Sequence, residues 1–184
     1  RLAKGGAQEF FGVTPDLCTF AKILGGGLPL GAIAGKKDIM EYFAPQGPVY
    51  QAGTFSGNPI SIRAGLSCLE QLNQPFYDGL NRRGNRLRLK LKDTIEDLDL
   101  NLQVNGIGSM FQIYFNPNPV TNYTEAKQSD DKLFLEYFRE LLKNGVFIPP
   151  SQFECCFISG AHTDEDLEKK TYYIEKSLKT IYKK

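Results

Sequence analysis

The first chemically informative feature of the sequence is Lys22, which lies three residues before a run of glycines at 25–27. A lysine amine becomes a nucleophile when it loses its proton, which burial and nearby positive charge promote. We expect Phe20, Ile23 and Leu24 to bury it. Because glycines carry no side chains, a flat ligand can lie against their backbone. The segment predicts a site for covalent lysine chemistry, although a Gly-rich turn with a lysine in solvent fits the same residues.

The elements that must position this lysine are predicted to be short strands joined by tight loops, because the chain is rich in Gly and Pro up to Pro59. Helices are expected to begin after it. Pro59 pre-sets the backbone for a first helix that runs to Leu69, with apolar residues at helical spacing. A longer helix follows, with one apolar stripe on its surface. The residues of that stripe are Leu80, Leu87, Leu91, Ile95 and Leu98.

Strands and helices with short connections fill the rest of the chain. Strands are predicted around 107–115, and a helix that opens after Asp130 and Asp131 and ends at a left-handed cap at Asn144-Gly145. Short strands are expected at 146–148 and 156–158, and Thr163 is expected to cap a final helix. The apolar stripe of that helix is Leu167, Ile174, Leu178 and Ile181. This order predicts a small α+β domain with a mainly antiparallel sheet after about residue 75.

Composition excludes several classes of function. The 184 residues carry 22 basic and 21 acidic side chains, a net charge of +1, so no strong field draws nucleic acid or an anionic membrane. The four cysteines show no spacing typical of a metal site or a disulfide framework, which favours a reducing compartment. No apolar run is long enough to span a membrane. Because the chain begins at Arg1 without Met or a clear element start, we expect it to continue upstream.

The segment Lys22-Ile23-Leu24-Gly25-Gly26-Gly27-Leu28-Pro29 resembles the lysine signature of the class III aminotransferases. The residues at 5–17 and 44–59 on either side of it are similar to one branch of that family, the glutamate-1-semialdehyde aminomutases. The resemblance continues to the end of the chain through 109–111, 150–154 and 159–163. It implies that residues 1–75 are the later part of a pyridoxal-phosphate-binding large domain of fold type I, the aspartate-aminotransferase-like α/β fold. Residues 76–184 would be its small C-terminal α+β domain.

The resemblance also implies roles for individual residues. Lys22 would hold pyridoxal 5'-phosphate covalently and act as the catalytic acid and base. Gly53 and Thr54 match a loop that reaches into the phosphate site of a partner subunit. Tyr50 and Gln51 would line the same cleft and contact the substrate. Glu154 matches a glutamate at the substrate mouth, where a buried carboxylate would repel ligands with a second negative charge. His162, the sole histidine, is expected to be structural.

The implied reaction is the isomerisation of glutamate-1-semialdehyde to 5-aminolevulinate in tetrapyrrole synthesis, through the pyridoxamine and pyridoxal phosphate forms of the cofactor. The implied assembly is a cytoplasmic homodimer, or a plastid one in a plant or alga, with no metal, nucleic acid or membrane. The acidic partner of the cofactor ring would lie upstream of Arg1, so these 184 residues alone are expected to be inactive. Two alternatives remain: a class III ω-aminotransferase, and a non-catalytic module with a Gly-rich loop.

Overall fold

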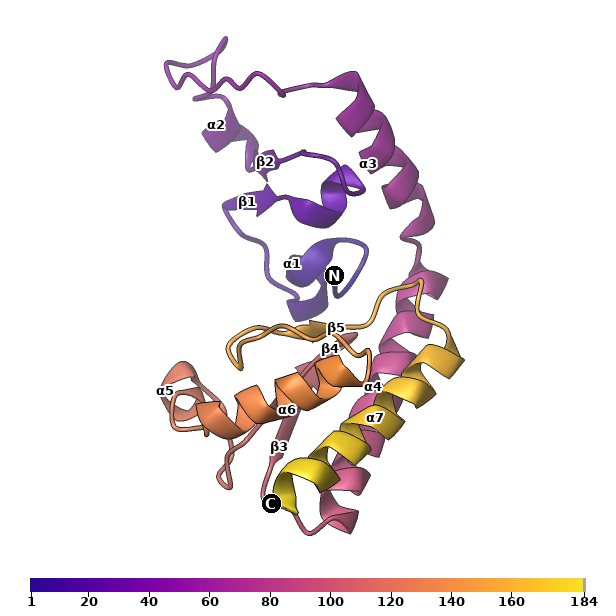
Figure 1. Cartoon of the computed structure of the whole chain (residues 1–184). Helices are drawn as coiled ribbons and strands as arrows, with labels where there is room; N and C mark the ends of the chain where they lie inside the picture. The colour runs from indigo at the N-terminus through magenta and orange to yellow at the C-terminus, as the bar shows by residue number, and fades with distance from the viewer. Residues whose placement is uncertain (184) are drawn as a thin grey trace. The chain divides into compact units, whose positions relative to one another are not determined.

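The structure is a computed structural model that describes residues 1–183 (Figure 1). The chain divides into two compact units, the first Arg1–Tyr77 and the second beginning at Asp78. No helix in the described part is long and apolar enough to cross a membrane.

The first unit is built around a hairpin. Strand β1 (Leu17–Phe20) pairs antiparallel with β2 (Ala32–Gly35), so that Phe20 lies opposite Ala32. The connection between these strands contains a 3-10 helix, η1 (Lys22–Gly25). Two short helices, α1 (Gly6–Phe11) and α2 (Lys37–Met40), flank the hairpin, and α3 (Pro59–Gln71) closes the unit.

The prediction that helices begin only after Pro59 is wrong, because α1 and α2 precede it. In α1 the carboxylate of Glu9 accepts a hydrogen bond of 2.6 Å from the backbone N–H of Gly5, just before the helix. Gly12 then ends the helix in the left-handed conformation, with φ of 64°. These caps stabilise a helix too short to show apolar periodicity in the sequence.

The predicted helix after Pro59 is confirmed as α3. The side chain of Asn58 accepts hydrogen bonds of 3.1 Å from the backbone N–H groups of Ile60 and Ser61, and Pro59 occupies the first turn. One face of α3 lies against η1, where a Cβ on Gly65 would come within 2.3 Å of the carbonyl oxygen of Leu24. Glycine at position 65 is therefore a condition for this packing.

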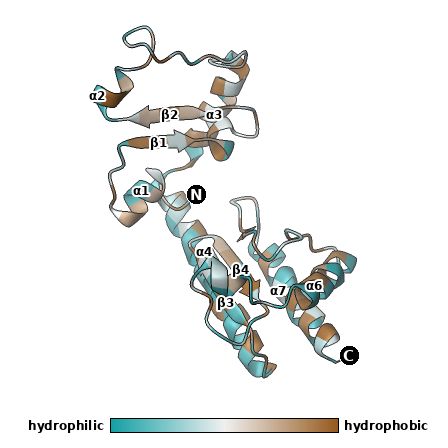
Figure 2. Ribbon diagram, turned by 90° about the vertical axis from the view of Figure 1, so that its left-hand side faces the viewer, coloured by the Kyte–Doolittle hydropathy of each residue, from teal (hydrophilic) through white to brown (hydrophobic). Residues whose placement is uncertain are grey.

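Little apolar surface is buried in the first unit. Among the described residues only two of its apolar side chains, Leu2 and Tyr77, are buried. Figure 2 shows hydrophobic residues along α2 and α3, and Ile60 is 70% exposed. Backbone pairing and close backbone approach, rather than a side-chain core, therefore hold this unit together.

The second unit is an α+β domain, as the sequence predicts. Its sheet is antiparallel, in the order β3-β4-β5, with β3 spanning Gln103–Ile107, β4 spanning Met110–Tyr114 and β5 spanning Cys156–Phe157. Its helices are α5 (Tyr123–Ala126), α6 (Asp131–Lys143), α7 (Asp164–Tyr182) and most of α4 (Gln74–Asp97).

The predicted helical stripes form the core of this unit. In α7 the four stripe residues Leu167, Ile174, Leu178 and Ile181 are all buried. Of the five predicted for the long helix, the four within α4 are buried, and Leu98 lies just past its end and is half-buried. Both predicted caps are present: Thr163 forms a capping box with Asp166, and Gly145 follows α6 with φ of 77°. The arginines of α4 tie it to α7, through a 2.5 Å ion pair between Arg86 and Asp164.

The strand predicted at 146–148 is absent, because the end of α6 uses the backbone there. The N–H of Val146 donates to the carbonyl of Leu141 at 2.9 Å, closing the last helical turn instead of joining the sheet. The strand predicted at 156–158 forms only over Cys156–Phe157.

We expect Ile174→Ala to lower the free energy of unfolding by about 2–5 kcal/mol, because the side chain is fully buried in α7 and its loss leaves a cavity. Ile60→Ala, on exposed α3, is the matched control and should change it by less than about 0.5 kcal/mol. Urea unfolding of both variants measures the difference. Equal losses would contradict the placement of the core in the second unit.

Candidate active site

Lys22 stands in an unusual backbone conformation at the first position of η1. Its φ is 54°, in the left-handed region, and Asp99 is the only other described non-glycine residue with positive φ. Such a conformation is disfavoured for side chains with a Cβ and is found preferentially at functional sites. The strain turns the chain at the end of β1, directly where the sequence predicts the reactive amine.

The expected burial of Lys22 is not present. Lys22 is exposed, and Phe20 and Ile23, expected to cover it, are themselves 38% and 40% exposed. The physical reason is that β1 has a single strand partner, β2, so no further layer of the described chain covers this side.

A hollow of about 540 Å³ opens beside Lys22. Its volume lies within the range typical of sites for small organic ligands. Two glycines, Gly5 and Gly6, line it together with the side chains of Lys4 and Tyr77, and none of its lining residues is acidic. It can hold a cofactor of pyridoxal phosphate size against Lys22, while an acidic partner for the ring nitrogen has to come from elsewhere.

The glycines at 25–27 have a structural task instead of lining this hollow. Gly26 has φ of 57°, and a Cβ there would come within 2.5 Å of the carbonyl oxygen of Ala64 in α3. Gly27 has φ of 97°. The glycines expected to lie against a ligand do not line the hollow beside Lys22, whereas Gly5 and Gly6 do.

The predicted phosphate-binding residues form a separate group. Gly53 begins a turn in which its carbonyl accepts a 2.9 Å hydrogen bond from the N–H of Ser56. Gly53 and Gln51 line a second hollow, of about 1070 Å³. Thr54 and Tyr50 are exposed and line neither hollow, and Tyr50 is 83% exposed.

The two hollows share one wall. Phe20, Leu24 and Leu69 line both of them, so η1 and α3 separate the Lys22 side from the Gly53 side. Within one chain the structure therefore groups Gln51 with Gly53 but does not bring either of them into the hollow that Lys22 lines.

Glu154 belongs to the second unit and is exposed, so the expected buried carboxylate is not present. It ends a turn in which its N–H donates to the carbonyl of Ser151 at 3.1 Å. Residues 153 and 154 of this turn are exposed, whereas Gln152 just before them is buried.

The sole histidine and the cysteines have structural surroundings. Nδ1 of His162 lies 3.0 Å from both the N–H and the hydroxyl of Ser159, which shapes the turn before α7. Burial raises the pKa of the Cys156 thiol to about 11, so it stays protonated and unreactive at neutral pH. No cluster of metal-binding side chains occurs among the residues that the structure describes.

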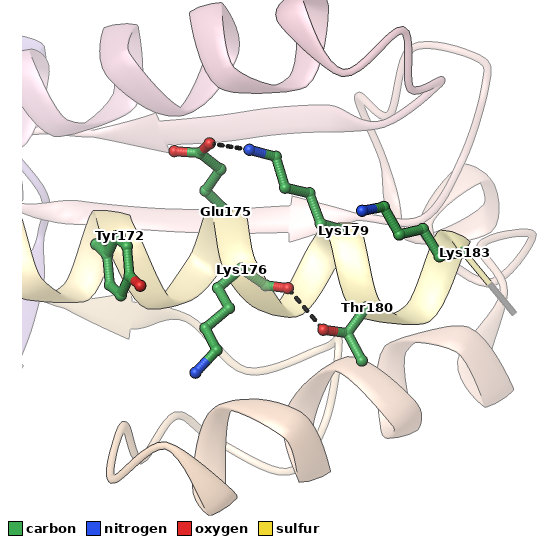
Figure 3. Close-up of a pocket in the computed structure, with 6 residues that line it drawn as sticks. All are labelled: Tyr172, Glu175, Lys176, Lys179, Thr180 and Lys183. Atoms are coloured by element: carbon green, nitrogen blue, oxygen red, sulfur yellow. Dashed lines mark hydrogen bonds and ion pairs between the residues drawn. The ribbon is translucent and has the colours of Figure 1, made fainter.

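A further hollow, of about 300 Å³, runs along α7 (Figure 3). Lys179 forms a 2.5 Å ion pair with Glu175 there, and Thr180 donates to the carbonyl of Lys176. These are contacts within the exposed face of α7, and they provide no reactive group.

Comparison with known proteins identifies the wider family. The model of the class III aminotransferases matches residues 3–178. A curated glutamate-1-semialdehyde 2,1-aminomutase from Methanobrevibacter smithii is 62% identical over all 184 residues, and one from Methanothermobacter thermautotrophicus is 58% identical over 168. The chain spans 44% and 40% of these two relatives, which is under half of their length.

Solved structures give the same fold. An omega-transaminase from Sphaerobacter thermophilus matches 98% of the chain with a TM-score of 0.88 and 29% identity. A glutamate-1-semialdehyde aminomutase from Pseudomonas aeruginosa, in complex with PMP, matches 98% with a TM-score of 0.85 and 20% identity. The chain covers 42% of each of them.

The conformation of Lys22 can be tested by stability alone. Lys22→Gly should be more stable than Lys22→Ala by about 1 kcal/mol, because glycine adopts positive φ without a steric penalty. At Lys90, on the exposed surface of α4, the order should reverse, with alanine more stable by about 1 kcal/mol. Chemical unfolding of the four variants measures both differences. A preference for alanine at position 22 would show that the lysine is not in the left-handed region.

Proposed function

Because this chain belongs to the class III aminotransferases, we propose that it is the C-terminal part of an enzyme that isomerises glutamate-1-semialdehyde to 5-aminolevulinate. The observation that carries the proposal is the 62% identity with an aminomutase over the whole length of the chain. The substrate and the activity of the whole protein are inferred from that relative.

Lys22 is the residue that holds pyridoxal phosphate and moves protons in this proposal. When bound, the cofactor stabilises negative charge on the adjoining substrate carbon. The amine of Lys22, at the hollow beside η1, holds the cofactor and, once released, carries a proton between the substrate carbon and the C4′ carbon of the cofactor. Its strained backbone fixes where the side chain begins.

Gly53 and Thr54 bind the cofactor phosphate of a second copy in this proposal. Their turn is exposed and lies outside the hollow that Lys22 lines, which suits a loop that serves another subunit. A threonine hydroxyl beside backbone N–H groups on a glycine turn can donate several hydrogen bonds to a phosphate. The functional unit is then a homodimer.

Glu154 discriminates among substrates, while Tyr50 and Gln51 line the substrate cleft. The exposed carboxylate of Glu154 meets the incoming ligand and repels one with a second negative charge. Glutamate-1-semialdehyde carries a single carboxylate and is admitted.

The two structural units correspond, in this proposal, to the later part of the cofactor-binding large domain and to the small C-terminal domain. The thiols stay reduced in a cytoplasmic setting, in keeping with four free cysteines.

A second candidate function is an ω-aminotransferase, because an omega-transaminase has the same fold at 29% identity. The two are separated with the intact protein by adding a keto acid such as pyruvate. An aminomutase forms 5-aminolevulinate without it, whereas an aminotransferase needs the keto acid to accept the nitrogen.

In the intact protein, Lys22→Ala should abolish both the isomerase activity and the attachment of pyridoxal phosphate that borohydride makes permanent, because one amine performs both tasks. Lys4→Ala is the matched control, since Lys4 lines the same hollow. Mass spectrometry after borohydride treatment and an assay of 5-aminolevulinate measure the two effects. Attachment that persists in Lys22→Ala, or is lost in Lys4→Ala, would refute the assignment.

Thr54→Ala should weaken cofactor binding roughly 10- to 100-fold, because it removes a hydrogen bond to a charged phosphate of about 1.5–3 kcal/mol. Thr14→Ala, another exposed threonine of the first unit, should leave it unchanged. Equilibrium dialysis with pyridoxal phosphate measures the affinity. Equal affinity in both variants would remove Thr54 from the phosphate site.

A further inference from the structure

One buried amide stands out in the second unit. Gln112 lies in the middle of β4 and is only 6% exposed. The two N–H groups of its Nε2 face three backbone carbonyls of a single loop, at 2.6 Å to Glu154, 3.1 Å to Gln152 and 3.4 Å to Ser151, so one N–H is shared between two of them. The shortest of these bonds goes to the residue proposed to select the substrate.

Only part of the edge of β4 that faces β5 is paired with that strand. β5 pairs with β4 at only two positions, Met110 with Phe157 and Phe111 with Cys156. Before Cys156 the strand ladder ends, and the side-chain amide of Gln112 bonds the backbone of residues 151, 152 and 154 there. Its Oε1 also accepts a 3.1 Å hydrogen bond from the N–H of Ile113 in its own strand.

A buried amide is stable only where its hydrogen bonds are made, so this one favours a single arrangement of the loop. Two further ties of the loop are internal, from the N–H of Phe153 to Ser151 Oγ at 3.2 Å and from the N–H of Glu154 to the carbonyl of Ser151. Two others reach outside it: Gln152 Nε2 donates to the carbonyl of Ser129 at 3.5 Å, and the ring of Phe153 lies 5.5 Å from that of Tyr123. Among the described residues none bonds to the carboxylate of Glu154. The place of that carboxylate therefore follows from the backbone that Gln112 holds.

We propose that Gln112 is a positioning residue that fixes the loop 151–154, so that the carboxylate of Glu154 meets the ligand at a defined place. The inference deepens the proposed function and rests on it for the role of Glu154. The link is through the backbone, and Gln112 itself does not touch the substrate.

The test is a double-mutant cycle in the intact enzyme with Gln112→Met, Glu154→Gln and the double variant. The measured quantity is discrimination: kcat/KM for 5-aminolevulinate formation, divided by the rate constant at which 2-oxoglutarate, a dicarboxylate, discharges the pyridoxamine form. We expect Glu154→Gln to reduce discrimination about tenfold and Gln112→Met about three- to tenfold. In the double variant the loss should equal that of Glu154→Gln alone, because Gln112 acts through Glu154.

Two results would overturn the inference: unchanged discrimination in Gln112→Met, or losses that multiply in the double variant, which indicate general damage to the fold. Gln103→Met is the control, because Gln103 bonds a carbonyl of Pro117 from the neighbouring strand, and its discrimination should equal that of the unmodified enzyme.

Hydrogen exchange tests, independently of activity, whether Gln112 holds the loop 151–154 in place. In Gln112→Met the amides of Phe153 and Glu154 should exchange about tenfold faster, while Gln103→Met leaves them unchanged. Wild-type exchange rates in Gln112→Met refute the positioning role. An intact enzyme that forms no 5-aminolevulinate, yet shows faster exchange in Gln112→Met, refutes the proposed function and leaves the positioning role standing.

Discussion

The backbone contact between η1 and α3 is the constraint on which the proposed site depends. Two glycines make it possible, because a Cβ on Gly26 would strike the carbonyl of Ala64 and a Cβ on Gly65 would strike that of Leu24. With α3 held this closely, the chain between β1 and η1 has to turn sharply, and Lys22 takes the strained conformation at that turn. The glycines thus act on the amine indirectly, through the path of the chain.

The two units are stabilised in different ways. The second has a continuous core from α4, α6, α7 and the sheet, in which Phe115 lies 5.4 Å, between ring centres, from Tyr137. The first has hardly any side-chain core and exposes large apolar groups on α3 and the hairpin. Apolar exposure on this scale marks surfaces made to be covered by other protein. Lys22, the lysine of the proposed site, therefore lies in the part of the chain that depends most on neighbouring polypeptide.

The elements that the sequence predicts correctly are those with more than one independent signal, such as an apolar stripe and a cap. α7 shows an apolar stripe and an N-cap together, α6 shows a left-handed C-cap, and these signals agree with the structure. α1 is not predicted, because its six residues are too few to show an apolar repeat. Its cap is also unusual, since it comes from the side chain of Glu9 within the helix. A chemical role for Lys22 stays a prediction from residue type and spacing, whereas its exposure could not be predicted, since burial depends on layers that local sequence does not encode. The role proposed for Gln112 could not be predicted from the sequence for a similar reason, because it depends on where β5 ends.

At Lys22 the residue type that suits the proposed chemistry differs from the residue type that suits the left-handed backbone. Glycine suits this conformation better than lysine, so a population selected only for yield of folded protein would accumulate glycine at position 22. Under the role proposed for Lys22, selection for catalysis opposes that drift. Position 22 is then a place where a substitution that removes the proposed function also relieves backbone strain.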